Sequence, residues 1–432
     1  MKCIHYELNN DMTVLMIPIK KTSIVTVGFF IKAGSNNDGQ HSGLAHFLEH
    51  MMFGGTYHRS RENIFNMLDS MGTNYNAVTT AQHTYYYISG HPDDIHKILN
   101  IVVDIYMNPT FDLSSIENER KVVIEEMRMG NDNPFIKIND KLHQKYFHDT
   151  PLHNNIIGTE QDILNINQSD LFNFRNKYYV PSNTVFVISG DFVPKQIFPP
   201  IEKILNTIPN NKLNDNNLDD NIIINNMKLQ QKPYISIEQN LTLCQSYVML
   251  TFPIYDLFKN HEQELNIISS LLSSGFSSRL FTSLRIDNGI TYTLSSYPMT
   301  YENAGVFIIR LIVHPNELLF CLHKIIDELK KIKYELIPKK EYKKINEMIK
   351  KESIFSSNQP IDWFTYFGLN FLYNRKFNPD LSNNEKITRA TSRKKIMEFS
   401  NIIFNFDRIN LFLYGNIKDD NIISHINEYV NN

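Results

Sequence analysis

Two histidines and a glutamate lie within five positions in the segment GLAHFLEHMMFGGT, residues 43–56. His46 and His50 are four residues apart, and on a helix this spacing places both imidazoles on one face, where they can bind one metal ion. Glu49 precedes His50, so its carboxylate could reach a water molecule on that metal without binding the metal itself. The alternative is an ordinary buried helix with three hydrogen-bonded polar side chains.

A catalytic zinc ion needs three protein ligands and one open position for water. The segment SSIENERKVVIEEMRMG, residues 114–130, offers carboxylates for the third ligand. Glu119 and Glu126 are seven residues apart, two helical turns, and therefore lie on one helix face. Periodicity does not distinguish Glu126 from Glu125. A solvated acidic face, paired with neighbouring Arg and Lys side chains, is the alternative interpretation.

The segments around these residues predict strands and helices in alternation. We expect the motif helix to start at Ser42 as a candidate N-cap and to stop at Gly54-Gly55. The other elements expected in the first half are strands within 11–33, a strand pair near 74–90, helices near 92–107, 114–129, 135–147 and 168–178, and a strand at 183–192.

The second half of the chain repeats this order loosely. We expect strands within 233–254, a helix near 263–274, a strand pair near 291–312 and a long helix near 315–333, and the segment RINLFLYGNI echoes the earlier NTVFVISGDF. An Asn- and Asp-rich stretch without a clear period separates the halves. We therefore predict an α+β fold with two related domains, residues 1–208 and 231–432, joined by a linker at 209–230. No HxxEH occurs in the second half, so the predicted chemistry lies in residues 1–208.

Composition narrows the classes of partner and compartment. The net charge is −3, and no dense run of Lys and Arg alternates with aromatic residues, so we expect neither nucleic acid nor membrane as a partner. Cys3, Cys244 and Cys321 form no CxxC pair, which argues against a thiolate zinc site and favours a reducing compartment. We see no signal peptide, transit peptide or transmembrane segment, and expect a soluble protein of the cytoplasm or another reducing intracellular compartment.

The motif and its flanking segments together resemble a known family. His46-Phe47-Leu48-Glu49-His50 followed by Glu126 is similar to the inverted-zincin metallopeptidases, the family of pitrilysin, insulin-degrading enzyme and the mitochondrial processing peptidase. The similar flanking segments are AGSNNDGQHSGLAHFLEHMMFGGT, TNYNAVTTAQHTYYY, PLHNNIIGTEQDI and KYYVPSNTVFVISGDF in the first half and SSGFSSRLFTSLRIDNGITYTLSSY in the second.

The resemblance implies a zinc site with its own general base. His46, His50 and Glu126 would bind one Zn²⁺ per chain, and Glu49 would take the proton of the attacking water. Glu119 would support the site as a second acidic residue.

Four further residues are implied to bind the substrate. Asn76 and Ala77 would lie on the edge strand to which a peptide adds as an extended strand. Arg285 and Tyr292 would hold the substrate near the scissile bond.

The resemblance also implies a fold and an activity. The fold would be two α/β domains, each a mixed sheet with helices on one side, in a clamshell arrangement. The activity would be that of a zinc-dependent metalloendopeptidase acting on unfolded peptides or N-terminal extensions, with a homodimer or a partner subunit closing the chamber. The alternative is a non-catalytic scaffold or assembly subunit on the same fold.

Other polar residues near the motif have simpler interpretations. His41, His58 and His83 lack ligand spacing to it, so we interpret them as surface or hydrogen-bonded residues. The basic segment GTYHRSRENIF is interpreted as a solvated loop rather than a substrate-facing patch.

Overall fold

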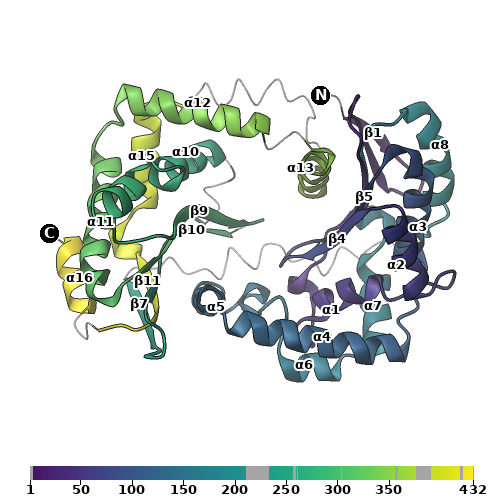
Figure 1. Ribbon diagram of the computed structural model, residues 1–432, viewed down its shortest axis with the longest axis horizontal. Coiled ribbons are helices and arrows are strands. Elements are labelled where there is room, and N and C mark those ends of the chain that lie inside the picture. Colours follow the sequence, from purple (N-terminus) through teal and green to yellow (C-terminus); the bar gives the residue numbers. More distant parts are fainter. Residues whose placement is uncertain are drawn as a thin grey trace. The chain divides into compact units, whose positions relative to one another are not determined.

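The computed structural model describes residues 3–210, 233–255, 259, 261–302, 304–355, 359–375, 391–418 and 422–431. They form two compact units, each with one sheet and its helices (Figure 1). Unit 1 takes its residues from Met1–Gly130, Pro151–Asp219 and Ile354–Leu381, and unit 2 from Asn131–Thr150, Asp220–Ser353 and Ser382–Asn432. The predicted linker lies outside the described residues from residue 211 onward. Within the described ranges, no helix combines the length and apolar character that crossing a membrane requires.

The sheet of unit 1 has six strands in the order β1-β2-β6-β3-β5-β4. Their bounds are β1 Ile4–Glu7, β2 Thr13–Pro18, β3 Val25–Ile31, β4 Asn74–Thr79, β5 Thr84–Gly90 and β6 Thr184–Gly190. β2 and β6 pair in parallel and the other neighbours are antiparallel, so the sheet is mixed. Strands β3 and β6 are buried along their whole length, as expected for apolar strands covered on both faces. β4 forms one edge of the sheet.

Most helices of unit 1 cover one face of this sheet. They are α1 Leu44–Met52, α2 Arg61–Ser70, α3 Ile95–Met107, α4 Leu113–Asn131, α6 Glu160–Asn165, α7 Gln168–Tyr178 and α8 Pro194–Leu205. The core between these helices and the sheet includes the stacked rings of Phe29 and Tyr106. Helix α2 begins inside the segment GTYHRSRENIF, which we interpreted from the sequence as a solvated loop. That interpretation was wrong from Arg61 onward. The Ser60 side chain caps the helix by accepting a hydrogen bond from the backbone amide of Asn63.

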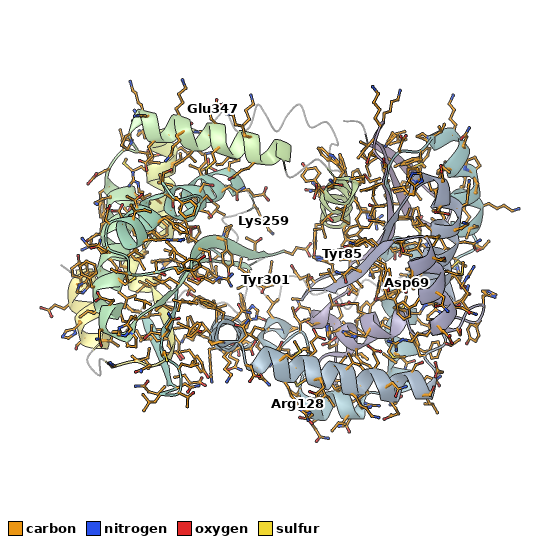
Figure 2. All side chains as sticks on the ribbon, in the orientation of Figure 1. Asp69, Tyr85, Arg128, Lys259, Tyr301 and Glu347 are labelled. Carbon is orange, nitrogen blue, oxygen red and sulfur yellow. The ribbon has the colours of Figure 1, made fainter. Side chains whose placement is uncertain are left out.

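A helix from late in the chain covers the other face of the sheet. Helix α13, Pro360–Tyr373, packs Phe364 and Phe367 against Leu15, Ile17 and Phe30 of the strands. Figure 1 shows α13 on one side of the sheet and α2, α3 and α8 on the other. Tyr85 lies on the α13 side as well, stacked on Phe30 (Figure 2). Helices therefore cover both faces of this sheet, where the family resemblance implied helices on one side.

Unit 2 has a five-stranded sheet in the order β7-β11-β8-β10-β9. The strands are β7 Tyr234–Gln239, β8 Ser246–Pro253, β9 Leu294–Tyr301, β10 Ala304–Val313 and β11 Asn410–Gly415. Its helices are α10 Glu262–Ser273, α11 Leu318–Tyr334, α12 Lys339–Phe355, α15 Arg393–Ile403 and α16 Ile422–Asn431, together with α5 Pro134–Tyr146 from the first half of the chain. Helix α5 meets the sheet through Tyr146, whose hydroxyl lies 2.9 Å from that of Thr251.

The two sheets share one plan. The order β7-β11-β8-β10-β9 repeats β2-β6-β3-β5-β4, and in each sheet the first pair is parallel and the following pairs are antiparallel. The predicted fold class, two related domains with mixed sheets, is confirmed. The difference is that each sheet receives one helix from the other half of the chain, α13 in unit 1 and α5 in unit 2.

Candidate metal centre

Helix α1 carries the HxxEH motif and is fixed at its N-terminus by Asp38. The Asp38 carboxylate accepts hydrogen bonds from the backbone amides of Gly43 (2.7 Å) and Ala45 (2.8 Å), two of the amides that a helix start leaves unpaired. Gly43 has φ of 90°, and a β-carbon there would lie 2.5 Å from the carbonyl oxygen of Ile157, so only glycine fits. The prediction that Ser42 caps the helix was wrong. Asp38 does so from five residues before Gly43.

His46, His50 and Glu126 form a cluster whose ligand atoms all lie within 4.8 Å of one another. Nε2 of His46 is 3.8 Å from Oε1 of Glu126, and Nε2 of His50 is 3.3 Å from Oε2. Two ligands bound at roughly 2.1 Å to one tetrahedral ion are about 3.4 Å apart, so these separations suit a shared metal. Two imidazoles and one carboxylate are also the donor set of a catalytic zinc with an open fourth position. The residues present therefore fit Zn²⁺.

The protonation of this cluster follows from burial and from neighbouring charges. Burial and the adjacent charge of His50 lower the pKa of His46 to about 4. Burial alone would lower the pKa of His50, but its hydrogen bonds to Glu119 and Glu126 outweigh that effect and raise the pKa to about 9. The hydrogen bond from His50 holds the pKa of Glu126 below its ordinary value. The carboxylates around His50 thus favour a positive charge on its ring, and a bound metal cation would place positive charge at the same point.

The structure distinguishes the two adjacent glutamates of α4. The carboxylate of Glu126 faces the histidines, whereas the Glu125 side chain is 65% exposed and pairs with Arg128 on the next turn. Periodicity could not make this choice, because adjacent positions on a helix differ by only 100°.

Glu119 lies two turns before Glu126 and is buried, with 5% of its surface exposed. Nδ1 of His50 donates to its Oε1 at 3.0 Å, and Nη1 of Arg61 donates to its Oε2 at 2.7 Å. Burial alone would raise the pKa of Glu119, but these two donors outweigh it and hold the pKa below its ordinary value. Glu119 therefore accepts as a carboxylate and orients the His50 ring.

Glu49 stands next to the cluster without being one of its three members. The hydroxyl of Thr79, the last residue of β4, donates to Oε2 of Glu49 at 2.5 Å. Burial raises the pKa of Glu49 even though the hydrogen bond from Thr79 lowers it. A carboxylate with a raised pKa, held in place through one of its two oxygens, has the chemistry of a general base.

The remaining predicted residues lie in two places. Asn76 and Ala77 lie on the edge strand β4, with Asn76 exposed. Arg285 and Tyr292 belong to unit 2 and contact each other, with the Arg285 guanidinium 4.5 Å from the centre of the Tyr292 ring. Arg285 lies near the end of a π-helical turn, Phe281–Ile286, and Tyr292 is 81% exposed.

In unit 2, the contact between helix α10 and the edge strand β9 has different side chains from the contact between α1 and β4 in unit 1. Helix α10 contacts β9 as α1 contacts β4, and serine side chains form hydrogen bonds across this contact. Ser273 and Ser296 lie 2.8 Å apart, and Ser269 donates to the Ser296 carbonyl at 2.6 Å. These hydrogen bonds join α10 to β9. Serine hydroxyls stand here in place of the two histidines and the glutamate that α1 carries in unit 1.

Two family models match consecutive parts of the chain. Residues 13–160 match the model described as Insulinase (Peptidase family M16), and residues 165–348 match the model of the Peptidase M16 inactive domain. This chain belongs to peptidase family M16. The resemblance to pitrilysin and its relatives is thereby confirmed.

Several M16 relatives are named as proteases or peptidase subunits. A protein from Rickettsia bellii, described as an uncharacterized zinc protease, is 28% identical over 355 residues, which are 81% of this chain and 79% of the relative. The yeast mitochondrial-processing peptidase subunit beta (Saccharomyces cerevisiae) is 32% identical over 204 residues, 47% of this chain and 44% of the relative. The crystal structure of a protease from Helicobacter pylori has a TM-score of 0.85 at 23% identity, with 96% of this chain and 99% of that chain covered. The two chains therefore share one fold.

Sequence reasoning missed three residues of this M16 centre. Asp38 caps the motif helix, Thr79 holds Glu49, and Arg61 holds Glu119. An acidic residue shortly before a predicted helix is a general capping signal and could have indicated Asp38. For Thr79 and Arg61 no local signal exists, because their partners lie 30 and 58 residues away in the sequence.

Proposed function

We propose that this chain is a zinc-dependent metalloendopeptidase that hydrolyses peptide bonds in unfolded peptides or N-terminal extensions. The observation that carries this proposal is the cluster of His46, His50 and Glu126 with Glu49 beside it. A ligand set alone would suit a structural ion, but an adjacent carboxylate that is not a ligand is what hydrolysis requires.

The cluster would hold one Zn²⁺ and leave one position open. When bound, zinc polarises a peptide carbonyl and lowers the pKa of water toward about 7. Glu49 accepts the proton of the attacking water and then delivers it to the leaving amine. Its raised pKa brings it closer to the working pH, where a carboxylate is most effective in both transfers. Glu119 keeps the His50 ring oriented during this cycle.

The edge strand β4 supports binding of an extended peptide. Its outer backbone groups can pair with a substrate strand, and this pairing is independent of side-chain sequence. Asn76 and Ala77 would contact that strand. The exposed ring of Tyr292 and the guanidinium of Arg285 are proposed as further substrate contacts from unit 2.

The proposal also includes a partner chain and a reducing cellular compartment. The yeast relative is named as a subunit, which supports a second chain or a homodimer that completes the peptidase. The three free cysteines support a reducing compartment such as the cytoplasm.

The second candidate is a scaffold or assembly subunit of the same fold. The match of residues 165–348, which include α7, β6 and α8 of unit 1 and a large part of unit 2, to an inactive domain supports this candidate. The complete cluster in unit 1 favours the peptidase, since a scaffold has no need of a metal with an adjacent base.

Zinc content and peptide cleavage, measured on the same preparations, separate the two functions. In Glu49→Gln we expect zinc to be retained and cleavage of an unstructured peptide library to fall by about 10²- to 10⁴-fold, the range for loss of a general base. His46→Ala and Glu126→Ala should lose zinc. Glu125→Gln, which changes the exposed neighbour of Glu126, is the matched control and should retain both. A wild-type chain without zinc, or unchanged cleavage in Glu49→Gln, would contradict the proposed mechanism.

A further inference from the structure

We propose that Arg61 is a positioning residue of the metal centre. It fixes the Glu119 carboxylate in the orientation in which His50 presents Nε2 to the metal. This inference rests on the proposed zinc site and adds to it a residue outside the HxxEH motif and outside α4. Arg61 is the first residue of α2 and lies in the segment whose sequence indicated only a solvated loop.

The argument starts from the two oxygens of Glu119. Oε1 accepts from Nδ1 of His50 at 3.0 Å, and Oε2 accepts from Nη1 of Arg61 at 2.7 Å. The second nitrogen of His50, Nε2, faces Glu126 at 3.3 Å. Because the two ring nitrogens are fixed relative to each other, the bond at Nδ1 determines where Nε2 points. Whatever fixes Glu119 therefore also fixes the direction of a metal ligand.

Glu119 has few ways to keep this orientation without Arg61. Its side chain is only 7% exposed, so water can replace a lost partner only in part. Removal of the guanidinium would leave Oε2 without its donor and free the carboxylate to rotate. His50 would then lose the fixed acceptor at Nδ1.

Arg61 is itself held in place from two sides. The helix N-cap at Ser60 fixes the backbone from which the side chain starts. The guanidinium lies 5.6 Å from the centre of the Phe65 ring, one helical turn later, in a cation–π contact. The side chain is 42% exposed, so it remains solvated while it donates inward to Glu119.

Charge balance at the centre supports the same role. Three carboxylates, Glu49, Glu119 and Glu126, lie around the two histidines. In the part of the chain that the structure describes, Arg61 is the one Arg or Lys side chain that forms an ion pair with any of the three. A divalent cation together with the Arg61 guanidinium would offset all three negative charges.

The competing interpretation is that Arg61 only ties α2 to α4. If the ion pair between Arg61 and Glu119 only held these two helices together, its loss would lower the free energy of unfolding and leave zinc affinity unchanged. The two interpretations therefore predict different zinc affinities for a variant that lacks the Arg61 guanidinium.

The test is the zinc affinity of the full chain, measured by competition with a chromophoric chelator. We expect Arg61→Gln to weaken zinc binding by about tenfold, the lower end of the effects of residues behind the ligands. Arg61→Lys should restore part of the affinity, since an ammonium can still donate to Oε2. Glu119→Gln should weaken binding at least as much, and the double variant should be no weaker than Glu119→Gln alone, because Arg61 acts through Glu119. The visible absorption of the Co²⁺-loaded chain should change in Arg61→Gln, since it reports ligand geometry.

Arg128→Gln is the matched control. Arg128 is an arginine of α4 that pairs with Glu125 and is 60% exposed (Figure 2), and its loss should change neither zinc affinity nor the Co²⁺ spectrum. Unchanged zinc affinity in Arg61→Gln, with or without lower thermal stability, would overturn the inference. Additive losses in the double variant would overturn it as well. A wild-type chain that does not bind zinc would instead overturn the proposed function, and the inference with it.

Discussion

The hydroxyl oxygen of Thr79 lies 2.5 Å from Oε2 of Glu49, which joins the end of edge strand β4 to the carboxylate beside the two histidines. The bond occupies one oxygen of Glu49 and fixes the direction of the other. An extended peptide that pairs with β4 would therefore be placed by the same strand that places the proposed base. Alignment of the substrate and alignment of the base are then coupled through one short segment of backbone.

Thr79→Val removes this hydrogen bond with little change in side-chain shape. We expect kcat for peptide cleavage to fall by about tenfold, because Glu49 loses its orientation, while KM and zinc content stay near the wild-type values. Thr79→Ser keeps the hydroxyl and should retain most of kcat. Steady-state kinetics with zinc analysis on the same samples check this. A lower zinc content in Thr79→Val, or equal loss in the serine variant, would argue against a role through Glu49.

The individual helices and strands were largely predictable from the sequence, because residues within each segment determine them. The strands β2, β3 and β6 are rich in β-branched and other apolar residues, and α7 is capped by Asn167, whose side chain accepts from two backbone amides at the helix start. The four-residue spacing of His46 and His50 was enough to show that a helix could present both imidazoles to one metal. Choosing Glu126 over Glu125 required the family resemblance, since helical periodicity does not resolve neighbouring positions.

Contacts between distant segments were not predictable in this way. Helix α13 packs on Phe30, and Arg61 donates to Glu119, yet in neither case does the sequence near one partner report the other. Amphipathic periodicity shows that a helix has an apolar face, but it does not show which sheet will cover that face. The exchange of α13 and α5 between the two halves therefore appears only in three dimensions.

The close approach of α13 to the sheet gives a prediction about stability. A β-carbon at Gly368 would lie 2.2 Å from Cε2 of Phe30, so Gly368→Ala forces the helix or the ring to move. We expect a loss of about 1–3 kcal/mol in the free energy of unfolding of unit 1, as for other overpacked cores. Helix propensity alone would give the opposite sign, a gain of about 1 kcal/mol. Urea unfolding decides between them, with Thr365→Ala, at a half-exposed position of α13, as the control.

A histidine in unit 2 gives a prediction about pH. Burial lowers the pKa of His143 on α5 to about 4, and its Nε2 lies 2.7 Å from the hydroxyl of Tyr301 on β9 (Figure 2). In the unfolded chain the histidine pKa is about 6.5, so below that pH the unfolded state binds a proton that the folded state does not. The contribution of this neutral histidine to stability is complete above about pH 6.5 and is lost as the pH falls toward 4.

Between pH 7.5 and 5.0 this loss amounts to about 2 kcal/mol in the free energy of unfolding of unit 2. His143→Gln keeps a neutral hydrogen-bonding side chain and should lose less stability over the same interval. The exposed His148 on the following loop provides the control substitution, His148→Gln, which should behave as wild type. The prediction would be wrong if wild type and His143→Gln lost the same free energy between the two pH values.

Removal of the metal should stop cleavage without unfolding the chain. The residues of the centre are held by the protein itself: Asp38 fixes the start of α1, Glu119 fixes His50, and Thr79 fixes Glu49. We therefore expect a chelator to abolish peptide cleavage, zinc to restore it, and the far-UV circular dichroism to stay unchanged throughout. The midpoint of thermal unfolding should fall on chelation, because a ligand that binds only the folded state at about 1,000 times its Kd stabilises that state by about 4 kcal/mol. Loss of helical signal on chelation would show that the metal, and not these hydrogen bonds, maintains the geometry of the centre. Cleavage that persists in excess chelator would rule out the zinc-dependent reaction.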